Sequence, residues 1–166
     1  MRSSLLTPAL IITLTVLSST TAYAGAKDKF TSFVLGLGVK TVLSEVQVQK
    51  GLGLIVSEYK KNEKEFATEQ STVMDIKVGN DRQLIYTFRL NNKLHFTEDV
   101  AAAGSLEAYA GFIRKSVSSN LCTLHGPSAN GVNEWYGQNN ITLVYEYFTP
   151  DNVFLTALAI NPRKDC

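Results

Sequence analysis

Four segments of this chain have the pattern of strands and lie in two neighbouring pairs, and three of the four alternate apolar and polar side chains with a period of two. In residues 71–78, Met74, Ile76 and Val78 fall on one face, and the Gly79–Asp81 cluster that follows is a turn signal. The next run shows the same alternation in Leu84, Tyr86, Phe88 and Leu90. Period two is the geometry of a strand, so this stretch predicts a hairpin.

The second pair lies at the C-terminal end. Residues 141–147 alternate, and residues 149–152 (TPDN) supply turn chemistry. Residues 153–160 are apolar on both faces, which is typical of a central strand, and Pro162 ends the run. Two hairpins predict an antiparallel four-stranded sheet.

The segments before and between the hairpins have helical periodicity. We expect one helix over 98–119, with Thr97 as its N-cap. Its apolar stripe is Ala102, Leu106, Tyr109, Ile113 and Val117. Residues 25–68 are predicted to be mainly helical, with a stripe that includes Val46, although glycines interrupt the pattern. The fold class is therefore α+β, in the order α-β-β-α-β-β, with amphipathic helices on one face of the sheet.

The first 24 residues have the layout of a secretory signal peptide. Arg2 precedes an apolar run of 13 residues, Leu5–Leu17, and Ala22-Tyr23-Ala24 forms an A-x-A cleavage pattern. The alternatives are a buried helix or a membrane anchor, but a span needs about 20 apolar residues. We expect cleavage after Ala24, a single domain at 25–166, a periplasmic or secreted location, and no stable membrane anchor after cleavage.

Export decides how the two cysteines are interpreted. Cys122 and Cys166 both lie in the predicted mature chain, and two thiols in an oxidising compartment usually pair. Their bond would close a loop of 45 residues and fasten the C-terminus. The alternatives are a Cys122/His125 nucleophile or half of a metal site. A thiol enzyme also needs an oriented base, and zinc needs three or four ligands, so we favour the disulfide.

The composition of the chain argues against several classes of function. The chain has 166 residues with a formal charge of +1, and loss of Arg2 makes the mature chain neutral. A neutral domain lacks the basic footprint of a nucleic-acid binder. With two His, two Cys and one Trp in the chain, we expect no catalytic centre, no metal site and no cofactor.

One segment carries a candidate binding pair. Residues 126–140 resemble a loop with at most a short helical turn, and they contain Trp135 beside Tyr136. Exposed aromatic side chains on loops can anchor a protein partner. The alternative is that Trp135 folds back onto the core.

The C-terminal two-thirds resembles a known family. The strand 84–90, a helix ending in Asn120-Leu121-Cys122, and the run ITLVYEYFTPDNVFLTALAINPRKDC are similar to small exported bacterial proteins, the β-class pilotins of type II secretion systems. Of the family's residues only Cys122 and Cys166 carry over. The resemblance implies a non-enzymatic protein that binds a secretin peptide in a groove. The chain departs from the family because it has no lipidation cysteine near the cleavage point.

These observations favour a non-enzymatic exported accessory module that binds another protein, for example in a bacterial envelope or secretion system. Two other classes stay open: an immunity or inhibitor protein directed against a toxin or hydrolase, and a carrier of a small ligand between helix and sheet.

Overall fold

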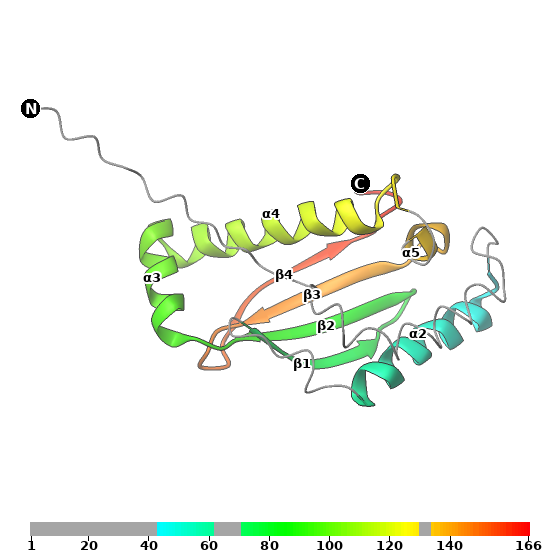
Figure 1. Cartoon of the computed structure of the whole chain (residues 1–166), viewed down its shortest axis with the longest axis horizontal. Coiled ribbons are helices and arrows are strands. Elements are labelled where there is room, and N and C mark those ends of the chain that lie inside the picture. Colours follow the sequence, from blue (N-terminus) through cyan, green and yellow to red (C-terminus); the bar gives the residue numbers. More distant parts are fainter. Residues whose placement is uncertain (1–42, 62–70, 130–133) are drawn as a thin grey trace, which may run out of the picture.

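The computed structural model describes residues 43–61, 71–129 and 134–166. The predicted signal peptide and the N-terminal part up to residue 42 lie outside these ranges. The described chain forms a four-stranded sheet in the order β1-β2-β3-β4 with helices beside it (Figure 1). In chain order the elements are α2 (Glu45–Lys61), β1 (Ser71–Val78), β2 (Gln83–Leu90), α3 (Lys93–Ala103), α4 (Leu106–His125), α5 (Glu134–Gln138), β3 (Thr142–Phe148) and β4 (Phe154–Ile160).

Both predicted hairpins are present, but the sheet is mixed rather than antiparallel. β1 pairs antiparallel with β2, and β3 pairs antiparallel with β4. The two hairpins meet through β2 and β3, which are parallel, with Leu84 opposite Leu143 and Phe88 opposite Tyr147. The reason is the connection between them: α4 carries the chain back along the sheet, so β3 starts at the same end as β2 (Figure 1).

The single helix expected over 98–119 is two helices. α3 starts earlier, where the Asn92 side chain accepts from the backbone N–H of Leu94 and His95, so Thr97 is not the cap. Gly104 ends α3 with φ +86°, a left-handed conformation that glycine adopts without strain. Ser105 then caps α4 by accepting from the Ala108 N–H at 3.1 Å. Because the break separates them from the main stripe, Ala102 and Leu106 are exposed.

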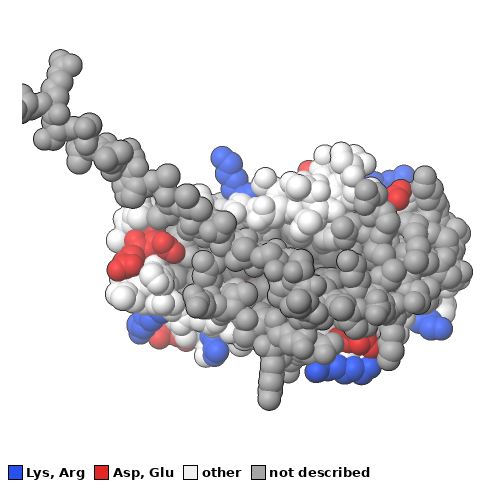
Figure 2. Space-filling model, viewed as in Figure 1, with Lys and Arg blue, Asp and Glu red and all other residues white. Residues whose placement is uncertain are grey.

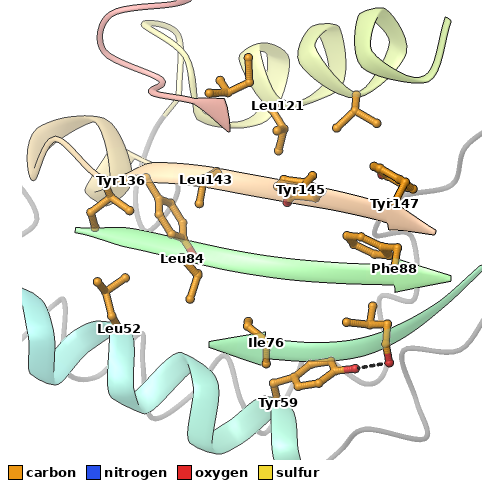
Figure 3. Close-up of a cluster of buried hydrophobic side chains, with 14 of the residues drawn as sticks. Leu52, Tyr59, Ile76, Leu84, Phe88, Leu121, Tyr136, Leu143, Tyr145 and Tyr147 are labelled. Carbon is orange, nitrogen blue, oxygen red and sulfur yellow. Dashed lines mark hydrogen bonds between the residues drawn. The ribbon is translucent and has the colours of Figure 1, made fainter. Parts of the chain in front are cut away.

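The apolar stripe of α2 differs from the expected one. Val46 is 78% exposed, whereas Val48, Leu52 and Tyr59 are buried. Spacings of four and seven place those three side chains on one helical face. The Tyr59 hydroxyl donates to the Val73 carbonyl at 3.0 Å, so α2 is fixed to β1 by a hydrogen bond as well as by packing (Figure 3).

Two strands depart from simple alternation. The register of β1 against β2 shifts between Val73 and Asp75, so Val73 and Ile76 are both buried while Met74 is exposed. This bulge overturns the expectation that Met74 and Ile76 share a face. β4, expected in the centre of the sheet, is an edge strand that pairs with β3.

The core lies on the sheet face that the helices cover. We call this the inner face: it presents Leu84 and Phe88 of β2 and the alternate β3 residues Leu143, Tyr145 and Tyr147, all buried. Leu52 of α2 and Leu121 of α4 reach this core from opposite sides in Figure 3. The pattern confirms the alternation predicted for β2 and β3.

Asn139 joins three segments at the end of the sheet where β2 and β3 begin. Its side chain is fully buried, its Oδ1 accepts from the Leu43 N–H at 3.1 Å, and its Nδ2 donates to the Trp135 carbonyl at 3.0 Å. Its carbonyl accepts from Arg82 Nη1 at 2.9 Å.

Replacing Asn139 with alanine removes the acceptor of a buried N–H. We expect Asn139→Ala to lower the free energy of unfolding by about 1–3 kcal/mol, because the Leu43 N–H then loses its hydrogen bond away from water. Urea denaturation measures the change, and Gln49→Ala on the exposed side of α2 is the control. Equal midpoints for the two variants would contradict this role for Asn139.

Candidate functional site

A disulfide joins Cys122 and Cys166, with the two Cα atoms 5.2 Å apart. Cys122 lies in the last turn of α4 rather than after the helix, since α4 continues to His125. A Cβ at Gly126 would clash with the backbone carbonyl oxygen of Cys122 and would lie 3.2 Å from the Cβ of Cys166, so a glycine is favoured beside the bond. The thiol of Cys122 is consumed by this bond, which removes the alternative of a Cys122/His125 nucleophile.

Asn161 shapes the tail that brings Cys166 to α4. Its N–H donates to Asp165 Oδ2 at 2.6 Å, its Oδ1 accepts from the Arg163 N–H, and its Nδ2 donates to Asn140 Oδ1 at 3.1 Å. Asn161 is 5% exposed, so these bonds form away from solvent. The C-terminal tail after β4 is therefore held by hydrogen bonds as well as by the disulfide.

Trp135 and Tyr136, the candidate partner-binding pair, are buried in α5. Trp135 is 1% and Tyr136 8% exposed, and their rings meet edge to face at 5.6 Å. His125 packs against Tyr136 with ring centroids 4.7 Å apart. The alternative that Trp135 returns to the core therefore describes the structure. That this pair binds a partner stays a prediction. Both side chains are buried in the structure.

The remaining polar candidates are dispersed. Within residues 43–61, 71–129 and 134–166, no three His, Cys, Asp or Glu side chains are arranged to hold a metal ion. His95 lies 3.4 Å from Glu98 on the exposed surface of α3. Burial, followed by the charge of Asp99, raises the pKa of Tyr109 to about 12. None of the described helices combines the length and apolar character that a membrane span needs.

Four aromatic rings run along the middle of the inner face. We call Tyr86, Phe88, Tyr145 and Tyr147 the aromatic ladder. Their rings stack in succession, at 5.0 Å for Tyr86–Tyr145, 5.5 Å for Phe88–Tyr145 and 5.1 Å for Phe88–Tyr147. Parallel pairing in register produces this stack, because like positions on β2 and β3 lie side by side. Burial raises the pKa of the Tyr147 hydroxyl.

The opposite, outer face carries an apolar area over β3 and β4. We call this area the outer patch; its apolar members are Val144, Phe148, Phe154, Ala157 and Ala159, and Glu146 lies on the same face opposite Ala157. Phe154 is 57% exposed and meets Phe148 edge to face at 5.7 Å. Ala157 and Ala159 are exposed, whereas Val144 and Phe148 are half-buried. Sequence reasoning missed this area because it placed the last strand in the centre of the sheet.

More apolar side chains lie at the nearby end of the molecule. Val153, next to Phe154, is 61% exposed, and Leu94 at the start of α3 is 67% exposed. The salt bridge from Lys93 to Asp151, at 3.0 Å, holds the start of α3 to the β3–β4 turn. The exposed apolar area at β4 is therefore bordered by a charged pair.

Charged side chains on the surface are mixed in sign. On the face shown in Figure 2, the described Lys and Arg side chains lie apart from one another around the rim, several beside Asp or Glu. The described residues of this face form no clustered basic stripe of the kind with which proteins follow a phosphate backbone. The charges of this face fit the nearly neutral composition.

Comparison with known proteins shows a likeness of fold. No protein-family model matches the chain, and no curated protein matches it. A solved structure from Pseudomonas aeruginosa, described as a putative secreted protein (PA3611), is similar with a TM-score of 0.52 at 12% sequence identity. The match covers 76% of this chain and 99% of the Pseudomonas protein. The two chains share an architecture, and their sequences have little in common.

Proposed function

We propose that the mature chain is an exported, non-enzymatic accessory protein that binds another exported protein through the outer patch. The observation that carries this proposal is the exposed Phe154 ring, packed on Phe148 in a strand without charge. Large apolar side chains gathered on an open sheet face are typical of protein–protein contact surfaces.

The two edges of the sheet support this choice of surface. Natural edge strands are commonly protected by charged residues and bulges, which discourage contact with other chains. β1 has both protections, since it carries Asp75, Lys77 and the bulge after Val73. β4 reads FLTALAI and has no charged residue. The edge that lacks charge is therefore the edge beside the outer patch.

Export of the protein is part of the proposal. The signal-peptide pattern at residues 1–24, the disulfide between Cys122 and Cys166, and the description of the Pseudomonas protein as secreted all agree with it. The resemblance to β-class pilotins supports an envelope or secretion system as the setting of the partner. A second copy of this chain is the other possible occupant of the patch, and the experiment distinguishes the two.

The test compares capture by three forms of the mature protein. Immobilised wild type and Val46→Asp should retain the same protein from the exported fraction of the source organism, whereas Phe154→Asp should retain at least about tenfold less. Val46 is the matched control because it is an exposed apolar residue on α2, away from β4. Equal capture by all three forms, or retention of this chain alone, would overturn the proposal.

A further inference from the structure

The edge of the sheet at β4 leads to an inference that rests on the proposed function and names the kind of segment the partner contributes. β4 pairs with β3 on one side, and none of the described strands lies on its other side. The backbone of an edge strand has N–H and C=O groups that another chain can pair with. This edge therefore offers hydrogen bonds in addition to the apolar contact of the outer patch.

The pairing register identifies which backbone groups of β4 point away from the sheet. In an antiparallel pair, residues hydrogen-bonded to the neighbouring strand alternate with residues whose N–H and C=O are directed away from it. The Thr149 N–H donates to the Val153 carbonyl at 2.8 Å, so odd-numbered positions of β3 face β4. The register shift near this turn adds a residue to β4 and leaves the alternation along β3 unchanged. Ala157 and Ala159 lie opposite even-numbered residues of β3, so their backbone groups are directed outward.

The two residues with outward backbone groups leave room for a neighbouring strand. Ala157 and Ala159 are exposed, and their small side chains belong to the outer patch. The regular stretch is limited at both ends, because Leu155 has no partner in the register and Pro162 follows the strand without an N–H. A partner segment of about five residues would match Thr156–Ile160.

One cation lies beside this edge without a carboxylate. α4 runs alongside β4 (Figure 1), and Arg114 of α4 donates from Nη1 to Thr156 Oγ1 at 2.8 Å. Thr156 is opposite Tyr147, so the guanidinium lies on the inner side of β4. Arg114 is exposed, and none of the salt bridges within the described ranges involves it. A carboxylate on the inner side of an added strand would give the guanidinium a charge-assisted hydrogen bond.

The same cation argues against a second copy of this chain as the added strand. Two antiparallel β4 strands centred on Ala157 would place their Thr156 residues at diagonal positions about 7–8 Å apart on one face. Both Arg114 side chains would then lie close together, and β4 has no carboxylate to separate the two charges. A strand with an acidic residue is therefore the better match for this edge.

We infer that the partner contributes an extended segment that pairs with β4 as an additional strand, through the backbone groups of Ala157 and Ala159. The side chains of this segment alternate. Those on the outer side are apolar and continue the outer patch, and one on the inner side is acidic and pairs with Arg114. Main-chain hydrogen bonds then supply affinity, while the apolar contacts and Arg114 select the sequence.

Binding of a synthetic peptide to the oxidised mature protein tests this inference. The probe is the blocked peptide TVTVEVTVT, and its control carries lysine in place of glutamate. Wild type should bind the glutamate peptide at least about tenfold more tightly than the lysine peptide, and Arg114→Glu should reverse the preference. Ala157→Pro, which removes an outward N–H, should bind the glutamate peptide at least about tenfold more weakly, whereas Ala157→Ser should stay within about threefold of wild type.

Hydrogen exchange of the wild-type protein provides the answer if Ala157→Pro does not fold. The glutamate peptide at about 1 mM should slow exchange of the Ala157 and Ala159 amides at least about tenfold, and the lysine peptide by no more than about twofold. If these amides were already slow without peptide, and their protection grew with protein concentration, a second copy would occupy β4. That result would overturn the inference.

Failure of this inference differs from failure of the proposed function. The absence of peptide binding, equal binding of the two peptides by wild type, or equal binding by Ala157→Pro and Ala157→Ser would overturn strand addition. Loss of partner capture by Phe154→Asp would still support the outer patch in each of these cases. Capture that Phe154→Asp leaves unchanged would overturn the proposed function itself.

Discussion

Replacing both Cys122 and Cys166 with alanine should lower the free energy of unfolding of the mature protein by about 4 kcal/mol. The disulfide spans 44 positions along the chain, and closing a loop of that size removes much of the entropy of the unfolded state. For a domain of this size the loss corresponds to a melting temperature about 10–15 °C lower. It also releases the tail after β4 from the end of α4.

Urea denaturation of the oxidised protein and of the double variant measures this effect. Reduced wild-type protein is the control, because it keeps the cysteine side chains and should unfold near the midpoint of the variant. A thiol assay on oxidised protein should find no free thiol. Two reactive thiols in exported material, or equal midpoints for oxidised and variant protein, would contradict the role assigned to the bond.

Trp135→Ala should lower the free energy of unfolding by about 3–5 kcal/mol, the usual cost of removing a large aromatic side chain from a core. Trp135 is 1% exposed, packs edge to face on Tyr136 and belongs to the hydrophobic core, so its loss leaves a cavity there. Fluorescence cannot report on this variant because the chain has one Trp, so far-UV circular dichroism in urea is the measurement.

Val46→Ala is the matched control for the tryptophan variant. It truncates an apolar side chain that is 78% exposed, and we expect a change within about 0.5 kcal/mol. If Trp135→Ala also changed stability by less than about 1 kcal/mol, the indole would contribute little to the core. The interpretation of Trp135 and Tyr136 as exposed anchors for a partner would then regain its support.

The strands were predictable because their pattern is local. Alternation from Leu84 to Leu90 and from Ile141 to Tyr147 survives in the structure, since each side chain is directed by its own backbone. The parallel pairing of β2 with β3 was not predictable in this way. It depends on how far the chain travels between the hairpins, which the pattern inside either hairpin does not record.

Two other differences between the predicted and the observed elements have causes that are visible in the local sequence. Gly104 followed by Ser105 is a stop signal next to a start signal, and it divides the predicted helix because both caps form. The bulge after Val73 inserts one residue into β1, which shifts every later side chain to the other face. Periodicity averaged over a window conceals both features.

The candidate site was predictable only in part. Pairing of Cys122 with Cys166 followed from export and the number of cysteines, and the structure contains that bond. The outer patch could not be predicted from the sequence, because an apolar strand such as FLTALAI has the same pattern at an edge as in the centre of a sheet. Because β4 pairs with β3 and has no strand on its other side, its place in the sheet decides which of its side chains are exposed.

Photo-cross-linking in the source organism tests the proposed partner surface most directly. A photoreactive phenylalanine analogue replaces Phe154 in one strain and Val46 in another, since both side chains are exposed. We expect a cross-linked species of higher mass from position 154, containing a different exported protein, and none from position 46. No adduct at position 154, or the same adduct from both positions, would contradict the claim that this protein binds a partner through β3 and β4.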